Sequence, residues 1–361
     1  NDYLGLADHP ALKEAAAKAI HDYGAGAGAS RLISGSLAPS HELEEALAAF
    51  KDTEAALTFS TGYAAALGTI PALLGRDDII IADKLIHACL VDGARLSGAK
   101  LRIFAHNDLE DLEAKLEWAS RREKSHLPPA PGENSETAPS LTSRSSPRIL
   151  IITESIFSMD GDAAPLREIV ALKEKYGAWM MVDEAHATGL YGATRRGLAE
   201  ALGVSDRIEI QMGTLGKALG ASGGYICGSR ALVDFLVNQA RSFIFSTAPV
   251  PAAAAAAIAA IKLLQSAEGD RLNRQLWERV SEFHTAIRKT PSGFSSAIIP
   301  IILGDECAAV AAASRLREQN IFVPAIRYPT VARGAARLRA TLTAAHTSGD
   351  IATLMSALAR H

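Results

Sequence analysis

The sequence predicts an α/β protein with a mainly parallel seven-stranded sheet, helices on both faces, and a smaller C-terminal α+β domain. Short β-rich runs alternate with helix-length amphipathic segments through most of the chain. The runs are apolar throughout, which is typical of parallel strands that are covered on both faces. Ligands of such sheets bind beyond the carboxyl ends of the strands, so we expect the functional residues at that edge.

Seven segments are predicted to be strands of this sheet. They are residues 56–60, 79–82, 101–104, 149–153, 179–182, 208–212 and 225–227. Amphipathic helices are predicted between them, as at residues 165–176, where Leu166, Ile169 and Val170 recur with helical spacing.

The pattern changes from about Pro249 to longer helices and fewer strands. We therefore expect a large domain at residues 1–248 and a smaller one at residues 249–361. Its predicted elements are an alanine-rich helix, strands at 298–302 and 337–342, a helix at 308–319 and a last helix from Asp350. Residues 120–148 are rich in Ser, Pro and charge without apolar periodicity, which predicts a mobile surface insertion.

Composition excludes several classes of protein. The 361 residues carry a formal charge of −3, so there is no basic excess for nucleic acid. Three distant cysteines provide neither a disulfide framework nor zinc spacing, and favour a reducing, cytoplasmic location. The most apolar stretch, residues 249–264, contains Lys262 and is short for a membrane span. The chain begins at Asn1 without an initiator methionine, so we expect a missing N-terminal segment.

Two motifs indicate functions that their context does not support. The glycines at 24, 26 and 28 follow a predicted helix, whereas a dinucleotide fingerprint follows a strand. Residues 182–186 (Val-Asp-Glu-Ala-His) are similar to the acidic box of helicases. A helicase also requires a phosphate-binding loop. The Gly216-Lys217 pair lacks the glycine spacing of that loop and the serine or threonine hydroxyl that follows its lysine.

Asp183 and Lys217 favour a different chemistry. Asp183 ends a predicted strand and Lys217 follows the next one, between Gly216 and Gly220 among apolar residues. Poor solvation lowers the pKa of a lysine and frees its amine for Schiff-base chemistry. A carboxylate one strand away could hold a protonated pyridine nitrogen. On spacing alone, a structural ion pair explains the two residues equally well.

Two further features lie at the same predicted edge. Ser60-Thr61-Gly62-Tyr63 joins a strand to a helix, where backbone N–H groups and the Thr61 hydroxyl form a phosphate cradle. His87 follows the strand at 79–82. Alone, Tyr63 could be a core aromatic and His87 a structural histidine; convergence on one edge favours the functional interpretation.

With these residues in place, the sequence resembles the α-oxoamine synthases, fold-type-I pyridoxal-phosphate transferases that condense an amino acid with an acyl thioester and release CO2. The resemblance covers the chain except for residues 120–148. Its motifs are Asn-Asp-Tyr-Leu-Gly-Leu at residues 1–6, Thr-Glu-Ser-Ile-Phe-Ser-Met-Asp-Gly-Asp at 153–162, residues 182–186 and residues 214–220.

The resemblance implies that the cofactor is pyridoxal 5′-phosphate and that Lys217, His87 and Asp183 are catalytic. Lys217 would form the Schiff base, Asp183 would hold the pyridinium nitrogen, and His87 would stack on the ring. His186 would hydrogen-bond the ring's phenolic oxygen. Further cofactor contacts are implied for Thr61, Gly62, Tyr63, Ser158, Thr214 and Thr247, the last reaching the other subunit of a homodimer with shared active sites.

The resemblance also implies substrate contacts. Arg339 would grip the amino-acid carboxylate with its planar guanidinium, assisted by Asn1; a solvated strand charge is the alternative. Ser30 leaves room for a methyl group, and Thr330 would contact the acyl substrate, with His87 also lining the site.

Residues 325–331 and 342–346 most resemble family members of biotin biosynthesis that use L-alanine and pimeloyl-CoA or pimeloyl-acyl-carrier protein. Members that use glycine or serine remain alternatives: 2-amino-3-ketobutyrate ligase, 5-aminolevulinate synthase and serine palmitoyltransferase. A non-catalytic scaffold is the alternative from another class. Neither a nucleic acid nor a membrane is expected as a partner.

Overall fold

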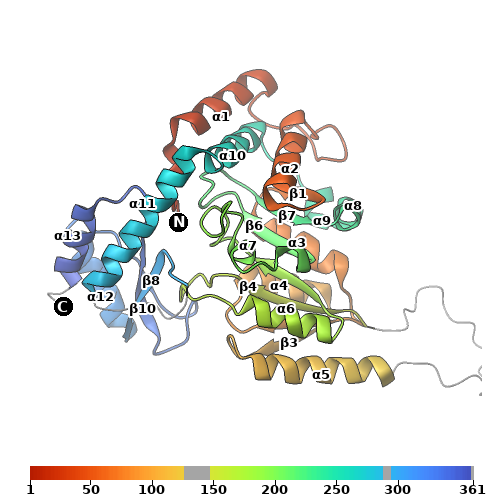
Figure 1. Ribbon diagram of the computed structural model, residues 1–361. Helices are drawn as coiled ribbons and strands as arrows, with labels where there is room; N and C mark the ends of the chain where they lie inside the picture. The colour runs from red at the N-terminus through yellow and green to blue at the C-terminus, as the bar shows by residue number, and fades with distance from the viewer. Residues whose placement is uncertain (126–146, 288–293, 359–361) are drawn as a thin grey trace, which may run out of the picture.

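The computed structural model describes residues 1–125, 147–287 and 294–358. Its main feature is a seven-stranded sheet in the order β1-β7-β6-β5-β4-β2-β3 (Figure 1). Only β7 runs antiparallel to its neighbours, so the prediction of a mainly parallel sheet is confirmed. The strands are β1 (Ala55–Phe59), β2 (Ile79–Asp83), β3 (Lys100–Phe104), β4 (Ile149–Glu154), β5 (Trp179–Asp183), β6 (Ile210–Thr214) and β7 (Gly224–Gly228).

Helices cover both faces because successive strand side chains point to opposite sides. Ile79 and Ile81 of β2 lie in one hydrophobic core, and Ile80 and Ala82 lie in the other. The first core is completed by α2 (Ala38–Lys51), α5 (Leu109–Ser125), α6 (Leu166–Lys175) and α10 (Pro251–Leu264), the second by α3 (Gly62–Leu73), α4 (Ala88–Ser97) and α8 (Arg230–Gln239). Continuous apolar strands follow from this two-sided burial.

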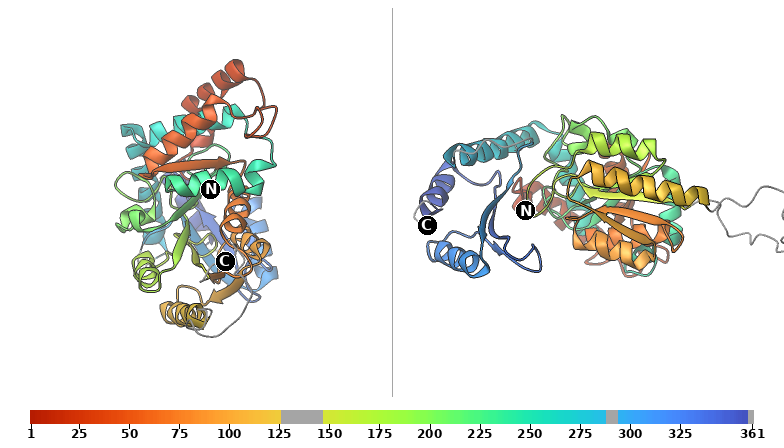
Figure 2. Two further views of the ribbon diagram at one scale, coloured as in Figure 1. Left: turned by 90° about the vertical axis from the view of Figure 1, so that its right-hand side faces the viewer. Right: turned by 90° about the horizontal axis from the view of Figure 1, so that it is seen from below.

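A second, antiparallel sheet of order β8-β10-β9 lies to one side of the main sheet (Figure 2). Its strands are β8 (Ile298–Gly304), β9 (Ala325–Ile326) and β10 (Ala336–Thr341), and its helices are α11 (Ala267–Ala286), α12 (Glu306–Glu318) and α13 (Ser348–Leu358). Between the sheets, α10 packs along α1 (Pro10–Tyr23). The proposed division at residue 248 stays a prediction.

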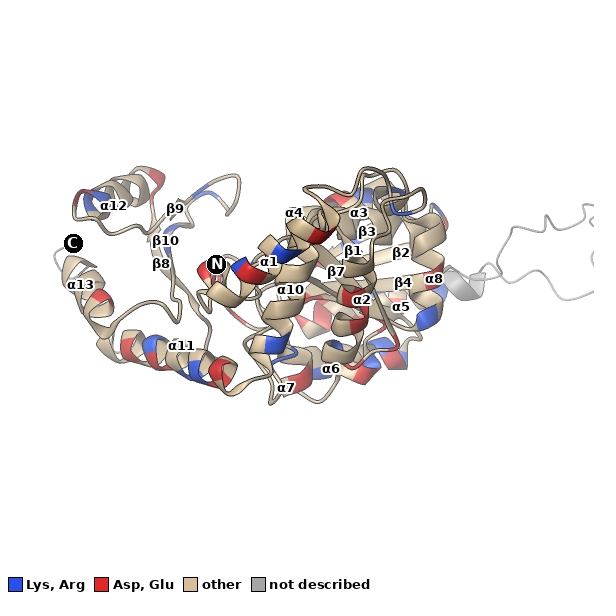
Figure 3. Ribbon diagram, turned by 90° about the horizontal axis from the view of Figure 1, so that it is seen from above, with Lys and Arg blue, Asp and Glu red and all other residues tan. Residues whose placement is uncertain are grey.

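The remaining helical elements are short. They are the 3-10 turns Leu6–Asp8 and Ser205–Arg207 and the helices α7 (Leu198–Ala201) and α9 (Arg241–Ile244). In Figure 3, acidic and basic residues are interspersed in red and blue along the ribbon of α11. Within the described ranges, no helix has both the length and the apolarity needed to cross a membrane.

Several expected boundaries differ from the structure, most by one or two residues, and two of the differences have a clear physical reason. The strand predicted at 208–212 runs from Ile210 to Thr214, because Ile208 ends the 3-10 turn before it. Residues 120–125 continue α5 and are not part of a loop: Arg121 pairs with Glu117 one turn earlier at 3.3 Å, and the first proline is only at 128. The rest of that predicted insertion, 126–146, lies outside the described residues.

A buried ion pair fixes the loop that follows β5. Lys51, the last residue of α2, places its Nζ 2.5 Å from Oε2 of Glu184, and each side chain is 1% exposed. Glu184 also accepts the backbone N–H of Ala199 at 3.0 Å. Gly197 leaves room for the carboxylate, since a Cβ there would lie 2.3 Å from Oε2. Glu184 is thereby fixed from two sides, directly beside Asp183.

We expect Lys51→Met to destabilise the protein by about 3–5 kcal/mol, because it leaves the Glu184 carboxylate buried and unpaired. Lys18→Met is the matched control, since Lys18 pairs with Asp22 on the exposed surface of α1 and should change nothing measurable. Urea unfolding curves of both variants test this. Equal effects of the two substitutions would contradict the role of the buried pair.

Candidate active site

Three neighbouring strands end in polar residues at the carboxyl edge of the main sheet. Glu154 ends β4, Asp183 ends β5 directly opposite it, and Thr214 ends β6. Lys217 follows Thr214 in a turn, where Gly220 bonds back to its carbonyl at 2.9 Å. Asp183 and Lys217 follow the carboxyl ends of β5 and β6, which are parallel neighbours, and therefore lie at the same edge of the sheet, as the sequence predicts.

Burial controls the protonation of this pair. Burial lowers the pKa of Lys217, and the nearby Asp183 carboxylate opposes that shift. Burial likewise raises the pKa of Asp183, which Lys217 opposes, as does the Ala185 N–H that donates to its Oδ1 at 2.8 Å. Removal from water therefore outweighs their attraction in both groups. The site thus holds an amine with a lowered pKa near a carboxyl group with a raised pKa.

A hydrogen-bonded chain connects Lys217 to the far end of the sequence. Its Nζ lies 2.8 Å from Nε2 of His186, whose Nδ1 lies 2.6 Å from the Tyr3 hydroxyl. The Tyr3 hydroxyl lies 3.3 Å from Oδ1 of Asn1, which accepts a hydrogen bond from Nη1 of Arg339 at 3.1 Å. We call Lys217, His186, Tyr3, Asn1 and Arg339 the Tyr3 chain.

Arg339 extends this chain to Ser158, to whose carbonyl its Nε donates at 2.6 Å. It is a buried residue of β10, so the alternative of a solvated strand charge is wrong. The structure thus joins five residues predicted for the site, Asn1, Ser158, His186, Lys217 and Arg339, in one hydrogen-bonded arrangement.

Two site residues were missed. Tyr3 stood in the first motif without an assigned role, and only its contact with His186, 183 positions away, reveals one. Glu154 is buried, and its Oε1 has no hydrogen-bond partner among the described residues. Burial and, next, the charge of Asp183 raise the pKa of Glu154 well above its usual value. The sequence signal for Glu154 was a carboxylate directly after a predicted strand, as for Asp183 at the end of the neighbouring strand.

His87 caps the N-terminus of α4, accepting the backbone N–H of Cys89 at 3.3 Å. Burial lowers its pKa, while the charge of Asp183 raises it and that of Lys217 lowers it. His87 therefore lies within electrostatic reach of both residues, as the sequence predicts.

The predicted phosphate cradle lies where α3 begins. Thr61 caps this helix by accepting the Ala64 N–H at 2.9 Å. A Cβ on Gly62 would lie 3.7 Å from Cβ of Thr214, so β6 and the helix start adjoin. Tyr63 is 44% exposed and its hydroxyl donates to Asp92, so the core-aromatic alternative is wrong.

Three predicted residues lie apart from this arrangement. Ser30 and Thr247 form an antiparallel bridge with each other. Thr330 is exposed in the segment between β9 and β10. No hydrogen bond within the described residues connects them to the Tyr3 chain, and their roles stay predictions.

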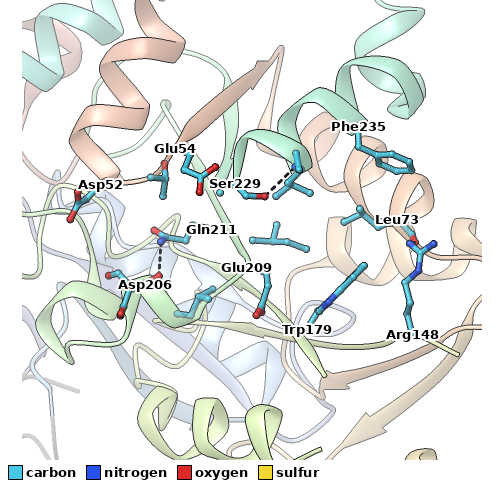
Figure 4. A pocket seen from close by; sticks show the side chains of 17 residues that line it. Asp52, Glu54, Leu73, Arg148, Trp179, Asp206, Glu209, Gln211, Ser229 and Phe235 are labelled. Carbon is cyan, nitrogen blue, oxygen red and sulfur yellow. Dashed lines mark hydrogen bonds between the residues drawn. The ribbon is translucent and has the colours of Figure 1, made fainter. Parts of the chain in front are cut away.

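A separate cavity of about 700 Å³ opens at the opposite edge of the sheet (Figure 4). Trp179 and Ile210, the first residues of β5 and β6, line it together with Gln211, Arg148 and Phe235. None of the predicted site residues lines this cavity. The candidate site at the carboxyl edge is therefore distinct from it.

The carboxyl-edge residues fit pyridoxal 5′-phosphate on chemical grounds. A buried carboxyl group beside a depressed-pKa amine suits a ring whose nitrogen carries a proton and whose aldehyde reacts with an amine. The start of α3 presents backbone N–H groups suited to a phosphate. The parts of the chain that the structure describes contain no group of three or more His, Cys, Asp or Glu residues arranged for a metal ion.

Comparison with known proteins shows the family to which the chain is related. The profile of the family "Aminotransferase class I and II" matches residues 1–358. An 8-amino-7-oxononanoate synthase of Geobacter sulfurreducens is 46% identical over 363 aligned positions, covering 100% of this chain and 87% of that protein. A serine palmitoyltransferase from S. paucimobilis with a bound PLP–myriocin aldimine superimposes with a TM-score of 0.87 at 30% identity, covering 99% and 84%. An 8-amino-7-oxononanoate synthase from Francisella tularensis gives 0.78 at 27% identity, covering 99% and 95%.

We expect Asp183→Asn to lower the pKa of Lys217 further, because it removes the charge that raises that pKa. The Lys217 amine should then react faster with formaldehyde and cyanoborohydride between about pH 7 and pH 9. Peptide mass spectrometry of the cofactor-free chain measures the rate at this lysine. Asp350→Asn, an exposed carboxylate of α13, is the control and should leave the rate unchanged. A slower reaction in Asp183→Asn would contradict the predicted direction.

Proposed function

Because the chain belongs to the class I and II aminotransferase family, we propose that it catalyses the decarboxylative condensation of L-alanine with a pimeloyl thioester. This is the 8-amino-7-oxononanoate synthase reaction, and the enzyme depends on pyridoxal phosphate. The Cα of alanine bonds to the thioester carbonyl carbon, the thiol and CO2 leave, and one proton is taken up. The observation that carries the proposal is 43–46% identity with such synthases over nearly the whole chain.

When bound, pyridoxal phosphate supplies an electron-withdrawing ring that weakens the bonds to Cα of the amino acid. Asp183 would hold the protonated ring nitrogen, since burial raises the pKa of this carboxyl group and a neighbouring cation favours its ionised form. Lys217 would hold the cofactor through its amine, and the free amine would take the proton from Cα of the amino acid. Burial favours the neutral, basic form of that amine.

Arg339 is proposed to bind the carboxylate of alanine. Its Nε and Nη1 are already fixed by the Ser158 carbonyl at 2.6 Å and by Asn1 and Thr341 at 3.1 and 2.7 Å. A guanidinium held from several sides loses little further entropy when its remaining nitrogen, Nη2, donates to a carboxylate. Asn1 assists it by holding Nη1 in place.

The acyl group is proposed to enter from the side of Thr330, and the methyl of alanine to lie near Ser30. A pocket distinguishes one methyl group by about 1–3 kcal/mol, so glycine is a poorer substrate and not an excluded one. Coenzyme A and acyl-carrier protein are both proposed as thioester carriers, and a cytoplasmic location is part of this proposal.

With pimeloyl-CoA, we expect turnover with L-alanine to exceed that with glycine or L-serine by about 10- to 200-fold in kcat/KM. Release of free CoA, followed with a thiol reagent, together with the 8-amino-7-oxononanoate product by mass spectrometry, measures it. Lys217→Ala should lose at least about a thousandfold in kcat and the visible absorbance of bound pyridoxal phosphate. Lys262→Ala, an exposed lysine of α10, is the control. A preference for glycine or serine would assign the chain to another activity of the family.

We further propose that the enzyme is a homodimer in which Thr247 reaches the other subunit's cofactor. Supporting this, four exposed apolar residues lie within three positions of Ser30 or Thr247 along the chain, and these two residues form a bridge. Their exposed fractions are 50% for Leu32, 80% for Ile33, 69% for Phe245 and 43% for Val250. Exposed apolar side chains are typical of protein–protein contacts where they lie together on one surface.

We expect Ile33→Glu to dissociate the dimer, because it places a charge in the proposed interface. Sedimentation velocity at micromolar concentration should show a dimer for the unaltered chain and a monomer for the variant. Ile302→Glu, which alters a similarly exposed isoleucine of β8, should remain dimeric. A monomeric unaltered chain would disprove the proposed dimer.

A further inference from the structure

Tyr3 occupies the centre of the Tyr3 chain although the proposed reaction gives it no role. It is 1% exposed, and its backbone carbonyl accepts the Ala344 N–H at 2.8 Å. Its ring meets the His186 ring edge-on, with centroids 6.1 Å apart. The hydroxyl lies among three polar neighbours: Nδ1 of His186, Oδ1 of Asn1 and the guanidinium of Arg339.

The donors around this hydroxyl determine where its proton points. A guanidinium can only donate, so the nearby Arg339 offers no acceptor for the Tyr3 proton. Burial raises the pKa of that hydroxyl, and the positive charge of Arg339 opposes this by lowering it. The oxygen of Asn1 is the more distant acceptor, at 3.3 Å, and it already accepts from Arg339. Nδ1 of His186 is the nearest acceptor, at 2.6 Å. We infer that the single Tyr3 proton points to Nδ1, the nearer of its two acceptors.

The other side of the imidazole is consistent with this direction. Burial lowers the pKa of His186 well below its usual value, so the ring is neutral and carries one proton. If Nδ1 accepts from Tyr3, that proton is on Nε2. Nε2 faces Nζ of Lys217 at 2.8 Å, and a neutral amine has a lone pair that can accept it.

We propose that Tyr3 is a positioning residue that locks His186 in the Nε2–H tautomer, making this histidine a fixed hydrogen-bond donor toward Lys217 and the cofactor. The part concerning the cofactor rests on the proposed function; the tautomer does not. Without the Tyr3 hydroxyl, Nδ1 has lost its donor and the neutral ring can place its proton on either nitrogen.

Two-bond 1H–15N correlation spectra of the cofactor-free chain, labelled with 15N-histidine, test the tautomer. His186→Gln identifies the signals of His186. We expect an unprotonated Nδ1 and a protonated Nε2 in the unaltered chain, and a population with Nδ1–H in Tyr3→Phe. Tyr191→Phe is the matched control, because it removes another buried hydroxyl, one that donates to the Ser295 carbonyl at 2.7 Å. It should leave the His186 signals unchanged.

Nδ1–H in the unaltered chain would overturn the proposal, and this measurement needs no variant to fold. A Tyr3→Phe spectrum equal to that of the unaltered chain, or a tautomer change in Tyr191→Phe as well, would also overturn it.

A second measurement tests the consequence for the cofactor. The pH midpoint of the visible absorbance change of the pyridoxal-phosphate-loaded chain should rise in Tyr3→Phe by about 0.5 to 1 unit, because a fixed donor at the phenolic oxygen favours the deprotonated form. The side chains whose charges act on His186, namely Lys217, Arg339 and His87, are the same in both proteins. An unchanged midpoint would overturn the effect on the cofactor. Absence of any cofactor band in the unaltered chain would refute the proposed function instead, with the tautomer result standing.

Discussion

A carboxyl group and an amine that are both removed from water, those of Asp183 and Lys217, constrain everything else at the carboxyl edge of the sheet. Each is pushed toward its neutral form by burial and held back by the other's charge. A cationic ring nitrogen beside the carboxyl group would offset the cost of burying the ionised carboxylate. A reactive carbonyl beside the amine would bond to its neutral form, which burial favours. The sheet topology brings the two together, since β5 and β6 are parallel neighbours.

The loop after β5 contains both a residue of a buried ion pair and residues of the candidate site. Asp183 faces the site, Glu184 faces the opposite way toward the buried Nζ of Lys51, and His186 returns to meet Lys217. Three residues within four positions thus face two sides, Asp183 and His186 toward the candidate site and Glu184 away from it. The ion pair on the hidden side is therefore a part of what orients the carboxyl group and the imidazole on the active side.

Much of this arrangement can be predicted from local sequence. Strands buried on both faces have a continuous apolar pattern, so the sheet and the residues at its carboxyl edge, such as Asp183 and His87, follow from it. The two-residue strand β9 is too short for any periodicity, and the start of β6 depends on a preceding turn. Helix continuation through residues 120–125 was obscured by the prolines that follow.

Tyr3 shows the limit of such reasoning. An aromatic residue near the start of the chain has no local feature that distinguishes a site residue from a core residue. Its importance arises from contacts with His186 and Arg339, which are remote in sequence and become neighbours only through tertiary packing. Glu154 is similar, because its unpartnered oxygen is visible only in three dimensions.

The hydrogen bond between Asn1 and Arg339 joins residues 338 positions apart. A chain emerging from the ribosome cannot close that contact until β10 has been synthesised, although the main sheet is complete more than a hundred residues earlier. The Arg339 end of the Tyr3 chain therefore forms only after all strands of the main sheet have been synthesised. A chain that stops before β10 would contain those strands and lack the contact between Asn1 and Arg339.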